Sequence, residues 1–391
     1  MSAILTLDAL SVKLPPGADR PHALEGVSFS VAANEIVCVV GESGSGKSMT
    51  ANAVMRLLPT GVAIDGGRVL FEGRDLAQLD EAAMRAVRGA GIAMIFQEPM
   101  TALNPLRTIG DQIGEMFSVH TDMDRAAIRA RVLDLLDEVR IPDPVEAAKA
   151  YPHELSGGQR QRAMIAMALA LDPKVLIADE PTTALDVTTQ AQILALIRDL
   201  QKRKGTAVMF ITHDFGVVAE IADRVVVMQH GRAVEQGPAE AILNRPQHPY
   251  TRELIAAVPR LTAPPPRKLA DATILTTDNV SKTYRNSGFL GRAARVTHAV
   301  KNVSLALPKG ATLGIVGESG SGKSTLARCI LRLIDPDSGA IVLDGKDLAK
   351  LSGSEMRAET KNIQMVFQDP FASLNPRRKA GELVAQGLIV H

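Results

Sequence analysis

The sequence predicts an α/β protein in which a mostly parallel sheet is flanked by helices, and it predicts this arrangement twice. Short apolar runs that fit buried strands occur at 36–40, 175–179 and 207–212. A longer stretch at 190–204 has the spacing of an amphipathic helix. Strands that alternate with helices favour a parallel sheet covered by helices. The segment GESGSGKS occurs at 41–48 and again at 317–324, which indicates a repeated unit.

The repeat extends well beyond these two loops. ILTLDALSVKL at 4–14 aligns with ILTTDNVSKTY at 274–284, and MIFQEPMTALNP at 94–105 aligns with MVFQDPFASLNP at 365–376. Three consecutive prolines between the copies favour an extended, semi-stiff linker. We therefore expect three parts in the chain, which are a complete domain at 1–260, a proline-rich linker at 261–272 and the N-terminal part of a second domain at 273–391.

Length and composition restrict the class of protein. A chain of 391 residues suggests two domains, and 46% hydrophobic residues are enough for real cores. The net charge of +1 gives no overall field that would favour nucleic acid or anionic lipid, so no nucleic-acid partner is expected. Two cysteines provide neither a disulfide framework nor metal-ligand spacing. No stretch approaches 18 uninterrupted apolar residues, so a role at a membrane would require a partner.

Both copies of GESGSGKS fit a phosphate-binding loop. Each follows an apolar run, EIVCVV at 35–40 or ATLGIV at 311–316, that is expected to form a strand, and each opens an amphipathic helix. The glycines let several backbone N–H groups converge on a phosphate chain, the lysine reaches the β- and γ-phosphates, and the serine ligates Mg²⁺. A glycine-rich turn with a chance lysine is the alternative, and two matches in the same context argue against it. The expected nucleotide contacts are Gly41, Glu42, Ser43, Gly44, Ser45, Gly46, Lys47, Ser48 and Met49 in the first copy, and Gly317, Glu318, Ser319, Gly320, Ser321, Gly322, Lys323, Ser324 and Thr325 in the second.

Three further motifs follow the first loop. LSGGQRQR at 155–162 precedes an apolar helix and is either an anion-binding helix start or a simple cap. Asp179 ends an apolar strand, where it can hold Mg²⁺, and Glu180 beside it can polarise an attacking water. A solvated strand edge is the alternative for this acidic pair. His213 ends another strand, and although most lone histidines are structural, ligands gather at this end of a parallel sheet.

Taken together, GESGSGKS, FQEP, LSGGQ, LIADEP, ALD and THD resemble the nucleotide-binding domain of an ATP-binding cassette (ABC) protein, which is a P-loop NTPase. The resemblance covers nearly the whole first copy. It implies ATP and Mg²⁺ as ligands, and an antiparallel β subdomain and a helical subdomain beside the parallel sheet. It also implies catalytic roles for Glu180, for the switch histidine His213 and for the Q-loop glutamine Gln97. The expected metal contacts are Ser48, Gln97 and Asp179 in the first copy and Ser324 and Gln368 in the second.

The resemblance assigns two further groups of nucleotide contacts. The signature residues Ser156, Gly157, Gly158 and Gln159 are expected to close over the γ-phosphate that is bound to the opposite domain. In the second copy, Tyr284 matches an aromatic residue that stacks on adenine. The aligned residue in the first copy is Leu14, an aliphatic residue that departs from this pattern.

Longer segments resemble one subfamily. YPHELSGGQRQR, ADEPTTALDVTTQAQIL and NRPQHPYTRELIAAVP at 244–259 are similar to the ATPase subunits of dipeptide and oligopeptide importers. Two copies on one chain resemble the fused ATPases of peptide, nickel, glutathione or microcin-type uptake systems. The resemblance implies an ATP-hydrolysing subunit that energises import of peptides or similar small solutes. It would lie at the cytoplasmic face of the bacterial inner membrane as a peripheral protein.

The same resemblance implies partners. Two integral-membrane permease subunits are expected to contact the chain directly, and a periplasmic or extracellular solute-binding protein would act indirectly. The residues after Gln97, at 98–120, and the matching segment 369–376 are expected to receive short cytoplasmic helices of the permease. An internal helical subdomain is a compatible reading of the first segment.

A soluble tandem ABC ATPase that acts on ribosomes or on DNA is the alternative function. A ribosome-acting protein would be expected to have a long charged linker helix, whereas this linker is short and proline-rich. A DNA-repair protein would be expected to have zinc-spaced cysteines or a coiled coil. The absence of tryptophan and the presence of only three tyrosines leave few platforms for base stacking. The importer is therefore favoured.

The second copy contains a phosphate loop and Gln368, whereas by alignment its signature, acidic pair and switch histidine would fall beyond His391. We therefore expect these residues to be a truncated form of a longer two-domain ATPase. Alone, they are expected to bind ATP but to hydrolyse it weakly, unless two chains pair as a homodimer through their first copies.

Overall fold

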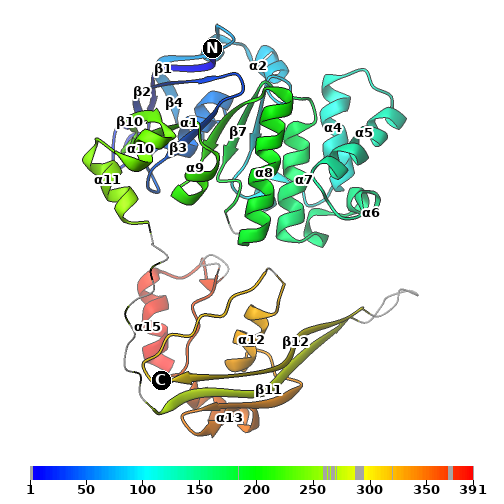
Figure 1. Ribbon diagram of the computed structural model, residues 1–391, viewed down its shortest axis with the longest axis vertical. Helices are drawn as coiled ribbons and strands as arrows, with labels where there is room; N and C mark the ends of the chain where they lie inside the picture. Colours follow the sequence, from blue (N-terminus) through cyan, green and yellow to red (C-terminus); the bar gives the residue numbers. More distant parts are fainter. Residues whose placement is uncertain are drawn as a thin grey trace. The chain divides into compact units, whose positions relative to one another are not determined.

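The computed structural model describes residues 3–183, 185–258, 271–286, 295–318, 320–368 and 373–390, and the single positions 262, 265 and 269. The chain divides into two compact units, Met1–Leu261 and Thr262–His391 (Figure 1). Most of the linker expected at 261–272 lies outside the described residues, as do Ser319 and the first half of the segment 369–376.

The first unit is built on a six-stranded sheet in the order β10-β9-β3-β8-β7-β6. Every neighbouring pair is parallel except β9 and β10, which are antiparallel, so the prediction of a mostly parallel sheet is confirmed. The predicted strands at 36–40 and 175–179 are β3 and β7, and the third ends one residue early as β8. The strands are β3 (Ile36–Val40), β6 (Ile92–Ile95), β7 (Val175–Asp179), β8 (Ala207–Ile211), β9 (Arg224–Gln229) and β10 (Arg232–Pro238).

Both faces of this sheet are buried because alternate side chains of each strand enter different cores. On β3, Ile36, Cys38 and Val40 join one apolar cluster, whereas Val37 and Val39 join the other. The first cluster is completed by helices, mainly α7 (Gly157–Leu169), α8 (Val187–Lys204) and α9 (Phe215–Ile221). The apolar runs that lack polar alternation in the sequence are therefore strands with two dry faces.

The second cluster is closed by an antiparallel sheet in the order β2-β1-β4-β5 and by α1 (Lys47–Met55). This sheet is the antiparallel β subdomain that the sequence led us to expect. Its strands are β1 (Ala3–Lys13), β2 (His22–Ala32), β4 (Ala63–Phe71) and β5 (Arg74–Asp75), and they are followed by η1 (Leu76–Gln78) and α2 (Glu81–Val87).

The helices between β6 and α7 lie beside the sheet (Figure 1). Side chains cap most of their N-termini, and Thr108 and Asp124 accept the backbone N–H groups of Asp111 and Ala127 at the starts of α4 and α5. The elements of this region are α3 (Pro99–Ala102), α4 (Ile109–His120), α5 (Arg125–Glu138), α6 (Pro144–Lys149) and η2 (Pro152–Glu154). The unit ends with α10 (Ala239–Asn244) and α11 (Pro249–Ala256).

The second unit contains an antiparallel sheet in the order β12-β11-β13-β14, against which α12 (Lys323–Ile330) packs through a small apolar cluster. Its remaining elements are β11 (Thr273–Asn286), β12 (Arg295–Pro308), β13 (Ser338–Leu343), β14 (Lys346–Asp347), η3 (Leu348–Lys350), α13 (Gly353–Glu359) and α15 (Ala380–Val390). In the described ranges of both units, every helix is too short or too polar to cross a bilayer.

The strand expected at 311–316 is wrong. These residues form no strand, and Leu313, Ile315 and Val316 are 46%, 45% and 92% exposed. Their counterpart in the first unit, β3, is hydrogen-bonded to β8 on one side and β9 on the other. Among the described residues of the second unit, no strand occupies either position. An apolar run without a partner cannot satisfy its backbone groups as a strand, so the expectation fails for lack of neighbours.

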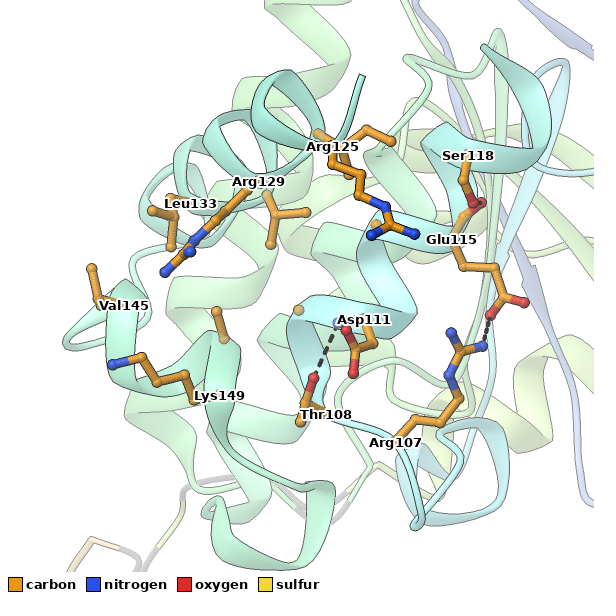
Figure 2. A pocket seen from close by; sticks show the side chains of 15 residues that line it. Arg107, Thr108, Asp111, Glu115, Ser118, Arg125, Arg129, Leu133, Val145 and Lys149 are labelled. Carbon is orange, nitrogen blue, oxygen red and sulfur yellow. Dashed lines mark hydrogen bonds and ion pairs between the residues drawn. The ribbon is translucent and has the colours of Figure 1, made fainter. Parts of the chain in front are cut away.

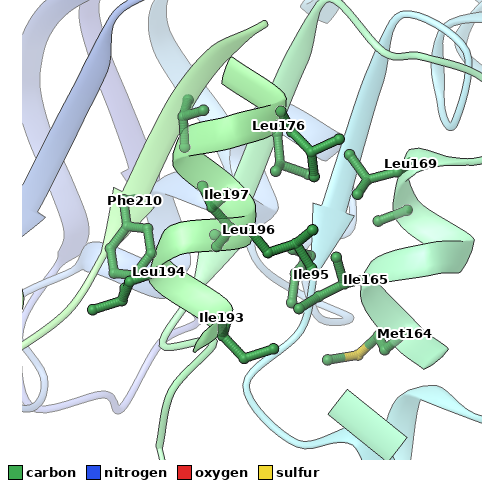
Figure 3. Packing of buried hydrophobic residues seen from close by; sticks show 14 of the residues in the cluster. Ile95, Met164, Ile165, Leu169, Leu176, Ile193, Leu194, Leu196, Ile197 and Phe210 are labelled. Atoms are coloured by element: carbon green, nitrogen blue, oxygen red, sulfur yellow. The ribbon is translucent and has the colours of Figure 1, made fainter. Parts of the chain in front are cut away.

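Phe210 lies on β8 with 0% of its surface exposed, among the apolar side chains of α7 and α8 (Figure 3). We expect Phe210→Ala to lower the free energy of unfolding of the first unit by about 3–5 kcal/mol, because it removes buried surface and leaves a cavity. Urea unfolding followed by far-UV circular dichroism measures this change. Leu106→Ala, at a side chain that is 85% exposed, is the control and should cost less than about 0.5 kcal/mol. Similar losses for the two variants would contradict the assigned core.

Candidate functional site

The first phosphate loop connects β3 to α1, and all three of its glycines have conformations that other residues rarely adopt. Gly41 has a φ of +151°, and a Cβ there would lie 2.2 Å from the carbonyl oxygen of Met228 on β9. Gly46 caps α1 with a φ of +108°. The neighbouring chain also holds the loop, since Gly231 donates its backbone N–H to the carbonyl oxygen of Ser45 at 2.9 Å. The loop is therefore fixed by contacts from β9 and the β9–β10 turn.

Lys47 lies under the loop with only 5% of its surface exposed. Its Nζ donates to the carbonyl oxygens of Gly41 and Glu42 at 2.7 and 2.9 Å. Burial lowers the pKa of the Lys47 ammonium, and the carboxylates of Glu180 and Asp179 oppose that shift. A buried cation at the N-terminus of a helix, beneath a curl of backbone N–H groups, fits an anionic ligand.

Ser48 and Asp179 meet at the C-terminal edge of the sheet. The Ser48 hydroxyl donates to Oδ1 of Asp179 at 3.0 Å, although the two residues are far apart in the sequence. Asp179 is 5% exposed, and burial raises the pKa of its carboxyl, while the hydrogen bond from Ser48 and the charge of Lys47 oppose the shift. A hydroxyl and a carboxylate are hard oxygen donors, so this pair fits Mg²⁺. The side chain of Gln97, the third expected metal contact, donates to Glu180.

Glu180 is the centre of a small polar cluster. The side chain of Gln97 donates to its Oε2 at 3.0 Å, the hydroxyl of Thr183 donates to the same oxygen at 3.0 Å, and Nδ1 of His213 lies 3.0 Å from Oε1. The backbone of Glu180 has a φ of +45°, which is uncommon for a residue with a side chain. The structure thus brings together the three residues that were expected to be catalytic, and it orients the carboxylate from both sides.

The signature residues Ser156, Gly157, Gly158 and Gln159 form the start of α7. Ser156 and Gln159 make a reciprocal capping box, in which the N–H of Gln159 donates to the Ser156 hydroxyl at 3.3 Å and the N–H of Ser156 donates to the Gln159 side chain at 3.0 Å. Neither of these two hydrogen bonds involves the phosphate loop. The motif caps the helix, and Ser156 and Gly157 remain exposed at the helix start. The structure is therefore compatible with both interpretations of the motif, a simple cap and an anion-binding helix start.

The second phosphate loop has the same sequence in a different environment. Lys323 again donates to two loop carbonyl oxygens, those of Gly317 and Glu318, at 2.6 and 2.7 Å, but it is only partly buried. In the described part of the second unit, no carboxylate hydrogen-bonds to Ser324 or Gln368. Tyr284 lies on β11 opposite Thr297 and is 38% exposed. Leu14, its counterpart, packs at the margin of a core cluster.

Comparison with known proteins identifies the family. The ABC transporter family model matches residues 24–183 and 300–386. The chain belongs to the ABC transporter family. A second model, the C-terminal region of oligopeptide and dipeptide transporters, matches residues 234–286. The chain is therefore an ABC transporter ATP-binding protein of the oligopeptide and dipeptide type. Its ATPase fold is the one expected from the sequence.

Individual relatives of this ABC protein include two curated transport proteins. A peptidoglycan transport ATP-binding protein of Agrobacterium fabrum is 48% identical over 99% of the chain, which spans 71% of that relative. A glutathione import ATP-binding protein of Escherichia coli K12 is 46% identical over 99% of the chain, which spans 67% of it. A dimeric bacterial ABC transporter cassette of known structure is 28% identical, with a TM-score of 0.55, and it matches over 60% of this chain and 98% of its own.

The structure adds two loop contacts that the sequence motifs did not reveal. The Arg20 side chain donates to the carbonyl oxygen of Gly44 at 2.7 Å, and the backbone N–H of Glu42 donates to the hydroxyl of Tyr250 at 3.1 Å. Tyr250 lies in HPYT at 248–251, within the segment 244–259 that resembles the subfamily. The sequence therefore marked this residue, but it assigned no role to its side chain. Arg20 had no such signal, because its contact depends on how β1 and β2 meet the loop.

Asp179→Asn is expected to raise the thermal denaturation midpoint of the nucleotide-free ABC protein. The raised pKa means that the ionised carboxylate destabilises the fold, and asparagine still accepts the Ser48 hydrogen bond. The cost is absent below the ordinary pKa of aspartate and develops as the pH rises through the raised value. The gain should therefore appear at pH 7.5 and vanish in acid.

Differential scanning calorimetry between pH 3 and pH 8 measures this dependence. Asp134→Asn, at an exposed position on α5, is the matched control and should leave the midpoint unchanged. A lower midpoint for Asp179→Asn at pH 7.5 would contradict a destabilising carboxylate at this position.

Proposed function

We propose that the first unit binds Mg²⁺-ATP at residues 41–48 and hydrolyses it to energise the import of peptides or similar small solutes. The observation that carries this proposal is the assembly of Lys47, Asp179 and Glu180 at one edge of the sheet, each with its own hydrogen-bonding partners. The family, the oligopeptide-type C-terminal region and the import role named for one relative support the substrate class.

Each residue of the site has a role that its geometry supports. Lys47 would face the β- and γ-phosphates, and Ser48 and Asp179 would hold Mg²⁺, which would neutralise phosphate charge. The Glu180 carboxylate accepts a proton from the attacking water. Because both of its oxygens already have partners in Gln97, Thr183 and His213, its orientation is set before the water arrives.

The signature is proposed to act on a nucleotide that another domain holds. LSGGQ occurs once in the sequence, at 155–159, while the phosphate loop occurs twice. The exposed start of α7 supplies N–H groups and a positive helix end to an incoming phosphate. Two chains that paired through their first units would join each loop at 41–48 to the partner's signature. A dimeric cassette among the similar structures supports this homodimer.

We also propose a tandem organisation, with a nucleotide-binding domain at 1–260, a linker at 261–272 and a second, related domain from 273. The two compact units and the second match of the same family model support it. The alternative, a soluble tandem ATPase that acts on ribosomes or DNA, is not favoured, because the relatives described above are transport proteins.

Membrane permease subunits are the proposed direct partners, and the cytoplasmic face of the inner membrane is the proposed location. A solute-binding protein on the other side would act through the permease. A pocket of about 770 Å³ lies between α4, α5 and α6, within the helical region that follows Gln97 (Figure 2). Its wall combines apolar residues such as Leu133 with Arg125 and Arg129, and Arg107 pairs with Glu115 at 2.6 Å at its margin. Such a mixed wall fits a short amphipathic segment of a permease subunit.

Lys47→Ala and Lys323→Ala are each expected to remove one ATP site, because each loop loses the cation that faces the β- and γ-phosphates. Equilibrium dialysis with Mg²⁺-ATP gives the stoichiometry of each single variant and of the double variant. Glu180→Gln is the control, since it should retain both sites while turnover falls by about 10²- to 10⁴-fold. Unchanged stoichiometry in the lysine variants would show that the loops do not bind the nucleotide.

A cysteine at Ser118, in the wall of the pocket, is expected to crosslink to a permease subunit in the assembled transporter. The native thiols Cys38 and Cys329 are buried, and burial raises the pKa of both, so they should not react in the crosslinking experiment. Arg68→Cys on the antiparallel sheet is the control and should give no crosslink. Mass spectrometry identifies the products, and an active complex without a Ser118 crosslink would exclude this docking surface.

A further inference from the structure

The helix α11 places one polar group against the first phosphate loop. Tyr250 is 6% exposed, and its hydroxyl accepts the backbone N–H of Glu42 at 3.1 Å, across 208 residues of sequence. The ring packs in the large apolar cluster of the first unit. A phenylalanine ring would fill this part of the core equally well, so the hydroxyl has a function beyond packing.

The N–H that Tyr250 accepts belongs to the same peptide unit as the carbonyl group that Lys47 contacts. The carbonyl of Gly41 and the N–H of Glu42 form one rigid plane, with Lys47 Nζ at 2.7 Å on one side and the Tyr250 hydroxyl at 3.1 Å on the other. An ammonium group has three donors, and Lys47 directs two of them at the carbonyl oxygens of Gly41 and Glu42. The orientation of this peptide plane therefore decides where the third donor points.

Hydrogen bonds to the backbone at and before Tyr250 hold the tyrosine in place. Glu235 on β10 accepts the N–H groups of Gln247 and His248 at 2.7 and 3.1 Å, which fixes the segment that precedes α11. Nδ1 of His248 then accepts the N–H of Tyr250 at 3.3 Å. Thr251, the next residue, is completely buried. A ring anchored in this way presents its hydroxyl at one place, which suits a group that fixes another part of the structure.

The second loop offers an internal comparison. Its octapeptide is identical, and Lys323 makes the same two contacts with loop carbonyl oxygens. Among the described residues of the second unit, however, no tyrosine hydroxyl contacts the N–H of Glu318. The two loops thus differ in the support of this peptide plane rather than in sequence.

We propose that Tyr250 is a positioning residue for the first nucleotide site, and that its hydroxyl holds the Gly41–Glu42 peptide so that Lys47 faces the phosphate chain. This inference rests on the proposed binding of ATP at residues 41–48. It gives the C-terminal region of the first unit a direct part in nucleotide binding. The occupant is a nucleoside triphosphate or diphosphate, because Lys47 acts on the phosphates rather than on the base.

The test uses the full chain with Lys323→Ala, so that only the first loop binds nucleotide. Adding Tyr250→Phe should weaken Mg²⁺-ATP binding in equilibrium dialysis by about fivefold to tenfold, since the ring remains while the part-buried N–H of Glu42 loses its acceptor. Thr206→Val removes a buried hydroxyl just before β8, at the edge of the sheet opposite the loop, and is the control that should leave the affinity unchanged. Unchanged affinity in Tyr250→Phe, or an equal loss in Thr206→Val, would overturn the proposal.

Amide hydrogen exchange provides a readout that a merely structural role would not move. In Tyr250→Phe, a fragment that spans 41–44 should exchange faster, whereas the corresponding fragment at 317–320 should not change. Unchanged exchange at 41–44 would overturn the proposal. Glu235→Gln loosens the anchor of α11 but keeps the tyrosine, so it should shift the affinity and the exchange rate in the same direction by a smaller amount. This variant replaces Tyr250→Phe in the test if Tyr250→Phe does not fold.

The outcomes separate this inference from the proposed function. If Lys47→Ala removes binding at the first loop while Tyr250→Phe leaves it intact, only the positioning role fails. If binding persists in a chain that carries both Lys47→Ala and Lys323→Ala, the assignment of the loops fails, whatever Tyr250→Phe does. In a Lys47→Ala background, Tyr250→Phe should leave the remaining affinity of the second loop unchanged, and a loss there would indicate a general effect on folding.

Discussion

The parallel pairing of β3 with β8 on one side and β9 on the other is the constraint on which the first phosphate loop and its surrounding residues depend. It fixes the end of β3, so that the loop that begins at Gly41 starts against the carbonyl of Met228. The pairing of β7 with the other side of β8 brings Asp179 at the end of β7 to the hydroxyl of Ser48. The described part of the second unit contains an identical loop without such flanking strands, and there the run at 311–316 is exposed and irregular. An identical octapeptide thus gives a buried lysine in one unit and a partly exposed lysine in the other.

The site concentrates charge that the fold alone would not favour. A buried ammonium at Lys47 and a buried carboxylate at Asp179 each have a pKa shifted by burial against their charged form. The positive φ of Glu180 adds local backbone strain at the residue whose carboxylate is held from both sides. These features oppose stability, and the phosphate chain and Mg²⁺ that this ABC protein is proposed to bind would supply the missing counter-charges. Such a compromise is typical of functional sites.

The C-terminal segment of the first unit connects family membership to mechanism. The region that matches oligopeptide and dipeptide transporters begins on β10 and includes α11. Glu235 lies near the start of that region, and its hydrogen bonds to the backbone before α11 hold Tyr250 against the phosphate loop. A segment recognised as a mark of the subfamily therefore contacts the proposed nucleotide site directly.

The sequence by itself determined the local elements and the identity of the motifs. Apolar runs gave β3 and β7 at their correct bounds, the signature was placed at the start of α7, and the repeated GESGSGKS located both loops. These features depend on residues that are close in the chain, so periodicity and capping chemistry are enough to find them. Only the tertiary structure decided that Gln97 meets Glu180 across 83 residues, that Tyr250 meets Glu42 across 208, and that 311–316 does not become a strand. Those outcomes depend on which distant segments are available as neighbours, because a strand or a buried polar group is stable only when something else in the fold completes its hydrogen bonds.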